Sequence, residues 1–183
     1  MELDEAIRGR RSIRRFDTRK IDDAVVEELI DLARHAPSSM NGQPWVFAVV
    51  REPGTKRRLA EIKNLYCPVE KRDYSADFIE QASAIVVVAV DRRASHDRDV
   101  ENGVLAAAHI MLAAHAKGLG SVYMSAQRQD EPAVSAAIRS VLGMPDHVAP
   151  ISILPLGYPA ETPEPKLLKP LSEIVTHERY RIG

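Results

Sequence analysis

The chain has one cysteine and no long apolar run. Cys67 is the only cysteine among 183 residues, which excludes an intrachain disulfide and a cysteine-based structural zinc site. A single thiol fits a reducing compartment, where a packed or surface thiol is more usual than a catalytic one. The start of the chain lacks the apolar segment of a secretory signal, and no run approaches the length of a membrane span. We therefore expect a cytoplasmic protein with no membrane as partner.

Net charge is nearly absent as well. Charged residues make up 28% of the chain, yet the formal net charge is −1. This balance gives no bulk attraction to nucleic acid, so we expect no nucleic-acid partner, and any anion site must be local. At 183 residues, 45% of them hydrophobic, the chain is expected to be a single domain over 1–183 with a sizeable core.

Several common catalytic patterns are also missing. The six histidines include no H-E-x-x-H spacing, so no metal site is expected. Ser38 and Ser39 lack the G-x-S-x-G context of a hydrolase nucleophile, and there is no Walker loop. The GLG at residues 118–120 follows a predicted helix instead of a strand, which argues against a dinucleotide fingerprint. The side chains therefore offer no catalytic constellation of their own.

One local concentration of charge stands out. The sequence RRSIRRF at residues 10–16, here called the arginine segment, holds four arginines and a hydroxyl. Arginine presents a planar fork of donors that matches phosphate, and serine adds a further donor. On an extended chain Arg10, Ser12 and Arg14 would share one face. The segment suits a phosphorylated ligand, and a solvated basic loop is the alternative.

A second polar stretch follows about 20 residues later. The sequence APSSMNGQPW at residues 36–45, here called the serine loop, lies between a predicted helix end and a predicted strand. Pro37 ends the helix, the serines and Asn41 can bond to nearby backbone or to a ligand, and Gly42 allows close backbone approach or an unusual dihedral. Such loops often carry ligand sites, although a plain connecting loop with a core tryptophan is the alternative.

Apolar periodicity predicts alternating helices and strands. We expect Asp22 to cap a helix that runs to about residue 35, and Thr55 to cap another after a turn at 51–54. The helix at 100–117 is apolar on most sides and should be central and buried. The strand at 84–90 is apolar throughout, as expected when both faces are covered. The other predicted elements are helices over 2–9 and 133–142 and strands over 45–50, 121–125 and 148–156.

Two stretches are harder to interpret. Residues 63–80 mix aromatic, charged and turn-forming residues, and are either a mobile segment over a pocket or a plain surface excursion. The stretch after Gly157 carries four prolines together with several large apolar residues, among them Leu167, Leu168 and Leu171. A disordered tail would not need so many apolar side chains, so we expect it to pack on its own domain or on a partner subunit.

The order and spacing of these pieces resemble the nitroreductase family of FMN-dependent oxidoreductases along nearly the whole chain. The matching pieces are the arginine segment, the serine loop, the strand at 84–90, Asp99 and Asn102 heading an alanine-rich helix, GLGS at 118–121, LGMP at 142–145, LGYP at 156–159 and HERY at 177–180. The resemblance implies an α+β fold with a mixed central sheet flanked by helices. It also implies a homodimer that exchanges extended C-terminal tails and holds two FMN sites at the subunit interface.

The resemblance also assigns residues. Arg10 and Ser12 would hold the FMN phosphate and ribityl chain, Arg14 would reach the flavin N1/O2 edge, and Arg179 would add a second arginine at the phosphate. The serine loop would face the flavin from the partner subunit, and backbone amides near residues 124 and 125 would approach N5. The full cofactor-binding set is Arg10, Arg11, Ser12, Arg14, Pro37, Ser38, Ser39, Asn41, Met124, Ser125, Gly157 and Arg179. Many members carry Glu-Gly where this chain has Met124 and Ser125.

The implied chemistry belongs to the cofactor. Hydride would pass from NADH or NADPH through flavin N5 to an electron-poor small molecule, a nitroaromatic or a quinone, in a ping-pong reaction. Two alternatives stay open. The chain could be a binding or storage module that holds FMN without turnover, or a specialised member that performs reductive dehalogenation or flavin breakdown.

Overall fold

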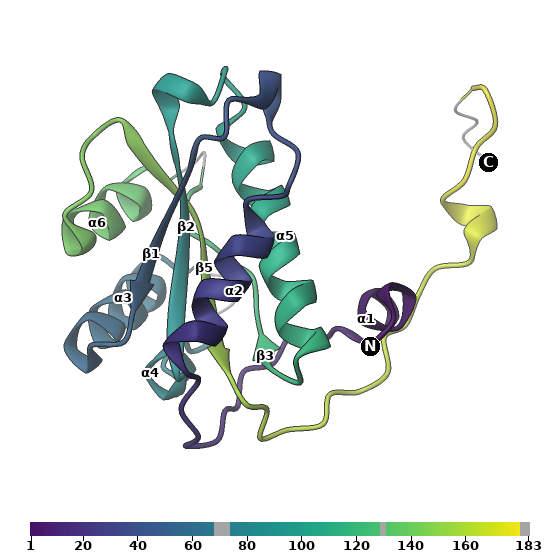
Figure 1. The fold of residues 1–183 in the computed structure, drawn as a ribbon, viewed down its shortest axis with the longest axis horizontal. Coiled ribbons are helices and arrows are strands. Elements are labelled where there is room, and N and C mark those ends of the chain that lie inside the picture. The colour runs from purple at the N-terminus through teal and green to yellow at the C-terminus, as the bar shows by residue number, and fades with distance from the viewer. Residues whose placement is uncertain (68–73, 129–130, 180–183) are drawn as a thin grey trace.

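The computed structural model describes residues 1–67, 74–128 and 131–179. Within them the chain forms an α+β fold around one sheet, whose strand order is β1-β2-β5-β3, with β4 also paired to β5 (Figure 1). The strands are β1 Trp45–Val50, β2 Ala84–Asp91, β3 Gly120–Ser121, β4 Met124–Ser125 and β5 Val148–Gly157.

The sheet is antiparallel in each of its strand pairings. Among the described residues, its parallel component is the isolated bridge between Ser12 and Ser121. The mixed character expected from the sequence is therefore limited to that bridge.

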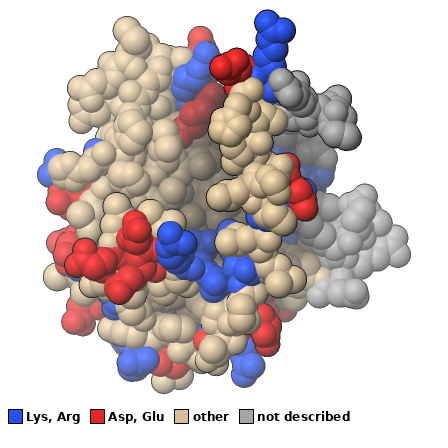
Figure 2. Space-filling view, turned by 90° about the vertical axis from the view of Figure 1, so that its right-hand side faces the viewer, with Lys and Arg blue, Asp and Glu red and all other residues tan. Residues whose placement is uncertain are grey.

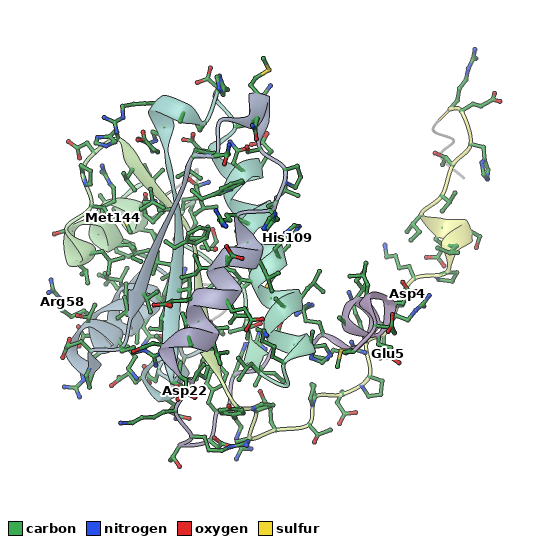
Figure 3. The ribbon with its side chains drawn as sticks, viewed as in Figure 1. Asp4, Glu5, Asp22, Arg58, His109 and Met144 are labelled. Atoms are coloured by element: carbon green, nitrogen blue, oxygen red, sulfur yellow. The ribbon has the colours of Figure 1, made fainter. Side chains whose placement is uncertain are left out.

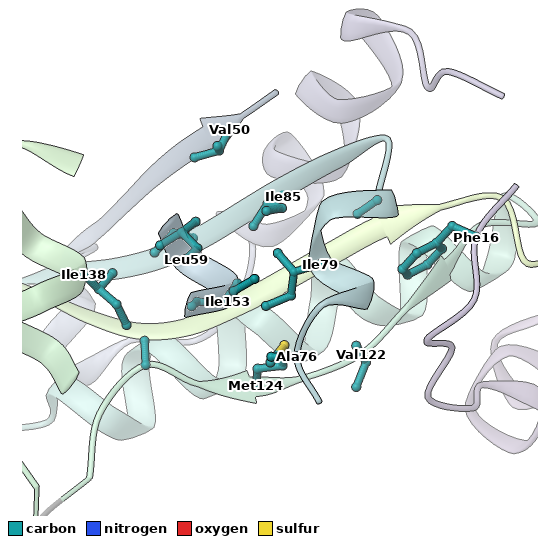
Figure 4. Packing of buried hydrophobic residues seen from close by; sticks show 14 of the residues in the cluster. Phe16, Val50, Leu59, Ala76, Ile79, Ile85, Val122, Met124, Ile138 and Ile153 are labelled. Atoms are coloured by element: carbon teal, nitrogen blue, oxygen red, sulfur yellow. The ribbon is translucent and has the colours of Figure 1, made fainter. Parts of the chain in front are cut away.

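Helices cover both faces of the sheet, as the continuous apolar run of β2 predicts. On one face, Ala84, Val86 and Val88 pack in a cluster with residues of α2 and α5. On the other face, Ile85 and Val87 join a second cluster with residues of α3, α4 and α6 (Figures 1 and 4). The helices are α1 Leu3–Gly9, α2 Asp23–Ala33, α3 Pro53–Leu65, α4 Phe78–Gln81, α5 Asp99–Ala116 and α6 Ala133–Leu142, with short 3-10 turns η1 Ser39–Asn41, η3 Arg92–Ala94 and η4 Leu171–Glu173.

Most predicted elements form where the sequence places them, but the start of α3 differs. The helix begins at Pro53, and Glu52 caps it by accepting hydrogen bonds from the backbone N–H groups of Gly54 and Thr55. Proline at the first helical position is favourable because its missing N–H would be unpaired there anyway. The predicted turn at 51–54 with Thr55 as cap is therefore wrong. Asp22 does occupy the N-cap position of α2, although its side chain makes no capping hydrogen bond.

Two further expectations are refined. The predicted strand over 121–125 is split into β3 and β4, because Val122 and Tyr123 fall outside the ladder with β5. Of residues 63–80, the first three belong to α3 and residues 78–80 to α4, while residues 68–73 lie outside the described residues. The middle of the predicted mobile segment therefore falls outside the described residues. Cys67, the residue just before 68–73, is half-buried.

Helix α5 is buried on only one side. Ala106, Ala107 and Ile110 are fully buried against the sheet, as predicted, but Val104 and Leu105 are 38% and 40% exposed. This exposed apolar face is the part of α5 that the sequence alone did not reveal. Among the described residues, no helix combines the length and apolar character needed to cross a membrane.

The C-terminal tail, residues 162–179, extends away from the sheet and its helices past α1 (Figure 1). Its apolar side chains lie in solvent in the single chain, with Leu167 and Leu168 96% and 74% exposed. Figure 2 looks onto the side that carries α1 and the tail, where an acidic and a basic group of side chains lie next to each other among broad uncharged areas.

Candidate functional site

The arginine segment lies against the edge of the sheet. The backbone N–H of Ile13 donates to the Ser121 carbonyl at 3.0 Å, next to the bridge between Ser12 and Ser121. Ile13 is buried, and a Cβ added at Gly120 would lie only 2.8 Å from it, so the segment packs flat on β3. With Ile13 turned into the core, the predicted alternation leaves Ser12 and Arg14 for the opposite face.

The arginine side chains have different partners. The Arg11 guanidinium donates to the carbonyl oxygens of Arg8 and Arg10 at 2.7 and 3.0 Å, so it closes the C-terminal end of α1. Arg10 is half-buried, and within the described residues its guanidinium has no hydrogen-bonding or ion-pair partner. The exposed Arg14 lies beside Tyr74: burial raises the pKa of the Tyr74 hydroxyl, and Arg14 opposes that shift. Of the predicted cofactor-binding arginines in this segment, Arg10 is therefore the one whose guanidinium has no partner among the described residues.

His115, in the last turn of α5, lies close to the arginine segment. A Cβ at Gly9 would lie 2.7 Å from its Nε2, so the ring packs on the end of α1. Burial lowers the pKa of His115, and the charges of Arg10 and Arg11 lower it further. The neutral imidazole is therefore favoured beside the two guanidiniums.

Gly157 has a packing role at this end of the sheet. It pairs with Gly120, and a Cβ at position 157 would lie 2.6 Å from the Phe16 ring. Phe16 is buried in the cluster shown in Figure 4. A side chain at position 157 would therefore displace the arginine segment from the sheet.

The serine loop is held by Asn102, a buried residue in the first turns of α5. Its Oδ1 accepts from the Ser39 backbone N–H at 2.9 Å, and its Nδ2 donates to the Ser95 carbonyl at 3.0 Å. Its own carbonyl accepts from the indole N–H of Trp45 at 3.2 Å. One amide residue thus ties the loop, the start of β1 and the turn before α5 together.

The backbone of the serine loop is unusual. Met40, Asn41 and Gln43 adopt positive φ angles of 50°, 53° and 46°, a region that non-glycine residues rarely occupy. Gly42 has an ordinary φ, but a Cβ there would lie 2.1 Å from the Ala94 carbonyl oxygen, so its role is close backbone approach. Such local strain is typical of functional sites and persists only where neighbouring structure fixes it. Pro37 and Asn41 are exposed, and Ser38 and Ser39 are partly buried.

Met124 and Ser125 form β4, where their side chains have different surroundings. Met124 is buried in the core cluster, so only its backbone is available to a ligand (Figure 4). Ser125 is partly exposed and lines an open cleft with Val100 and Tyr123. The ammonium group of Lys63 donates to the Ser125 carbonyl at 2.7 Å, which fixes the backbone at this position.

The two polar segments lie at opposite ends of the sheet. Ser121, which carries the arginine segment, pairs with Leu156, and Leu156 pairs with Ala84 at the start of β2. The serine loop leads into Trp45, which pairs with Val90 at the other end of β2. Six residue steps along a strand correspond to about 20 Å. A single chain therefore does not bring the two predicted halves of the site together.

The predicted second arginine is also apart from the first. Arg179 is exposed and is the last described residue of the tail, and the tail leads away from the sheet on which the arginine segment lies (Figure 1). The single chain thus holds the arginine segment against Gly120 and Gly157 through Ile13 and Phe16, and leaves the serine loop and Arg179 elsewhere.

The comparisons with known proteins decide the family. A model described as the nitroreductase family matches residues 7–158. The chain belongs to the nitroreductase family. An archaeal relative from Methanothermobacter thermautotrophicus, whose name pairs NADH dehydrogenase with NAD(P)H nitroreductase, is 32% identical over 89% of this chain and 80% of its own.

Two more proteins with other names are similar to this chain. The solved structure of the NADPH:FMN oxidoreductase of Vibrio harveyi, in complex with NAD⁺, has a TM-score of 0.80 and 25% identity, and the match covers 98% of this chain and 78% of that one. The iodotyrosine deiodinase of Thermotoga neapolitana is 28% identical over 94% of this chain and 95% of its own. The fold and the family expected from the sequence are therefore confirmed.

Sequence reasoning missed three supporting residues of this nitroreductase-family chain. Asn102 was noted as part of the resemblance, but no pattern indicated that it holds the serine loop. Lys63 was placed in the irregular segment although it binds the backbone of Ser125. Glu161 accepts hydrogen bonds from backbone N–H groups of the arginine segment, and no sequence signal marks it. Each acts through a contact between residues distant in the sequence.

Proposed function

We propose that this chain is an FMN-dependent oxidoreductase that takes hydride from NADH or NADPH and reduces an electron-poor small molecule, a nitroaromatic or a quinone. The observation that carries the proposal is the arginine segment, which is fixed on β3 and leaves the Arg10 guanidinium without a partner among the described residues. The family and the FMN named for the Vibrio harveyi protein support it.

The donor set fits an FMN phosphate. The Arg10 guanidinium and the Ser12 hydroxyl are donors that suit a phosphate, and the pKa of His115 is lowered by burial and also by the nearby charges of Arg10 and Arg11. Arg10 and Ser12 would bind the phosphate and ribityl chain, and Arg14 would bind the flavin N1/O2 edge. Arg11 is engaged with the end of α1, so its contribution would be charge and not direct contact. FMN supplies the redox chemistry when bound, and the protein binds, orients and screens it.

A second copy of the chain would complete the site. The serine loop lies about 20 Å from the arginine segment along the sheet, so Pro37, Ser38, Ser39 and Asn41 would act on the cofactor of the partner subunit. Arg179 would likewise reach a phosphate of the other copy, because its own tail leads away from its own arginine segment. The exposed apolar residues of the tail and of α5 support an extended homodimer interface.

The cleft beside Ser125 is where the reacting molecules would meet the cofactor. Lys63 holds the Ser125 carbonyl, and the Met124 side chain is buried, so the backbone of β4 presents a fixed edge to the ligand. Donor and acceptor would use this space in turn, which is the structural requirement of a ping-pong reaction. In that case double-reciprocal plots are parallel, and intersecting lines would indicate a ternary complex.

Reductive dehalogenation is the second candidate, favoured by the similarity to the iodotyrosine deiodinase of Thermotoga neapolitana. An FMN-binding module without turnover is the alternative outside enzymes. Reduction of the bound flavin by excess NADH or NADPH supports an oxidoreductase, and a preference for iodotyrosine over nitroaromatics and quinones would favour the deiodinase reading. If neither donor reduces the bound flavin, the result would support the FMN-binding module without turnover.

The test of the proposal is an FMN titration of the Arg10→Ala variant. A charge-assisted contact to phosphate contributes about 1.5–3 kcal/mol, so FMN affinity should fall by about one to two orders of magnitude. Arg58→Ala is the matched control, because Arg58 is an exposed arginine on α3, on the far side of the sheet from α1 (Figure 3). Unchanged affinity in Arg10→Ala, or an equal loss in both variants, would contradict the assignment.

A further inference from the structure

Glu161 binds the backbone of the arginine segment. One of its carboxylate oxygens accepts a hydrogen bond from the backbone N–H of Arg14 and a second, of 3.1 Å, from that of Arg15. Glu161 lies 147 and 146 positions from Arg14 and Arg15 in the sequence, so this contact forms only in the folded chain. Because the carboxylate is charged, its hydrogen bonds from the two backbone N–H groups are stronger than those of a neutral acceptor.

The residues just before Glu161 are paired with the end of the arginine segment. The backbone N–H of Asp17 donates to the Tyr158 carbonyl at 2.9 Å, and that of Ala160 donates to the Arg15 carbonyl at 2.9 Å. A bridge between Phe16 and Pro159 lies between these two bonds. The strand-like pairing of the two segments holds Glu161 in register with Arg14, immediately before the tail departs.

Arg14 is therefore held on two sides. Its backbone is bonded to the carboxylate of Glu161, and its guanidinium lies near the Tyr74 hydroxyl, whose pKa it affects. Tyr74 packs on the same core cluster as Ile13 and Phe16, the buried residues on either side of Arg14. Because its backbone is bonded to Glu161, the point from which the exposed Arg14 side chain extends is fixed.

We propose that Glu161 is a positioning residue: its carboxylate fixes the backbone of Arg14 so that the guanidinium meets the flavin N1/O2 edge. This inference rests on the proposed function, in which Arg14 binds that edge. It also links the tail to the site, because Glu161 is the last residue paired with the arginine segment before the tail begins. A tail bound to a partner subunit would therefore be connected, through Glu161, to the segment proposed to hold the cofactor.

The test compares FMN binding in Glu161→Ala, Glu161→Gln and the control Glu164→Ala, which removes an exposed carboxylate from the same tail. Loss of the acceptor should weaken FMN binding about tenfold in Glu161→Ala, and Glu161→Gln, which keeps an acceptor oxygen, should recover most of that loss. The flavin reduction potential should fall in Glu161→Ala, because a displaced Arg14 stabilises the reduced anionic flavin less. Glu164→Ala should match the wild type in both measurements.

A double-mutant cycle with Arg14→Ala tests whether Glu161 acts on FMN binding through Arg14. If Glu161 acts through Arg14, Glu161→Ala weakens FMN binding little further once Arg14 is absent. An additive loss, or a wild-type affinity and potential in Glu161→Ala, would overturn the inference while leaving the proposed function in place. Absence of FMN binding by the wild type would overturn both. If Glu161→Ala does not fold, Glu161→Gln in the same cycle provides the measurement, with a coupling of the same sign that is smaller because this variant keeps an acceptor oxygen.

Discussion

At the scale of single residues, Asn102 holds the serine loop without being placed in contact with the cofactor. It is 2% exposed and satisfies the Ser39 N–H and the Ser95 carbonyl with its side-chain amide. The serine loop has three positive φ angles, so it depends on such contacts to keep its shape. The conformation of the proposed partner-facing residues is thus determined by the first turns of α5.

We expect Asn102→Ala to destabilise the protein by about 1–3 kcal/mol, because it leaves a buried donor and a buried acceptor unpaired. Chemical denaturation monitored by circular dichroism measures this change. Gln81→Ala, which removes an exposed amide at the end of α4, should change stability by less than about 0.5 kcal/mol. Equal stability of Asn102→Ala and the wild type would show that the loop does not depend on this amide.

At the scale of elements, the contact between α1 and α5 should make stability depend on pH. The pKa of His115 is lowered from 6.5 by burial and by Arg10 and Arg11, so the unfolded chain takes up a proton at a higher pH than the folded one. Stability attributable to His115 is therefore constant above about 6.5 and falls as the pH drops from there through the lower folded pKa.

The prediction is a loss of stability on acidification that is smaller in His115→Gln than in the wild type. Urea unfolding of both proteins between about pH 7 and about pH 5 tests it, because the difference between them removes the contribution of the other titrating groups. Parallel pH profiles would mean that His115 titrates alike in the folded and unfolded chains.

Most elements could be predicted from the sequence because their signals are local. The all-apolar pattern of β2 is explained by helices on both faces, and Gly143 ends α6 with a φ of 64°, as expected of a helix-ending glycine. The start of α3 was misplaced because Pro53 and Gly54 also suit a turn, and the capping by Glu52 is visible only in its hydrogen bonds. Likewise, periodicity showed that α5 is apolar but not which face the sheet leaves exposed.

The site was predictable only in its parts. The arginine segment and the serine loop were recognisable as candidate ligand-binding stretches; Ile13 is buried, and of the two roles open to Gly42 the structure shows the close approach. Their distance from each other, the engagement of Arg11 with α1 and the role of Glu161 depend on contacts between remote segments. Such contacts leave no periodic or compositional trace.

At the scale of the whole molecule, the exposed apolar tail predicts a dimer. Sedimentation should give about twice the chain mass of 20.3 kDa, with an interface at the large end of the usual range, about 2,000 Å² or more. Replacing Leu167 and Leu168 by serine should weaken both dimerisation and FMN binding. The control is Lys169→Ser in the same tail, which keeps the apolar side chains. A folded monomer that retains FMN would contradict the shared site.

The most direct test of the central claim, an FMN site built from two chains, is complementation between two variants with weakened FMN binding, compared at an FMN concentration that saturates the wild type and neither variant. One carries Arg10→Ala, and the other carries Ser39→Pro, which removes the N–H bonded to Asn102 and disrupts the serine loop. After co-refolding, mixed dimers would combine the intact arginine segment of one chain with the intact serine loop of the other. FMN binding and NAD(P)H-dependent reduction should return in roughly a quarter of the sites. No recovery in confirmed mixed dimers would contradict the account, because it would place both halves of each site in one chain.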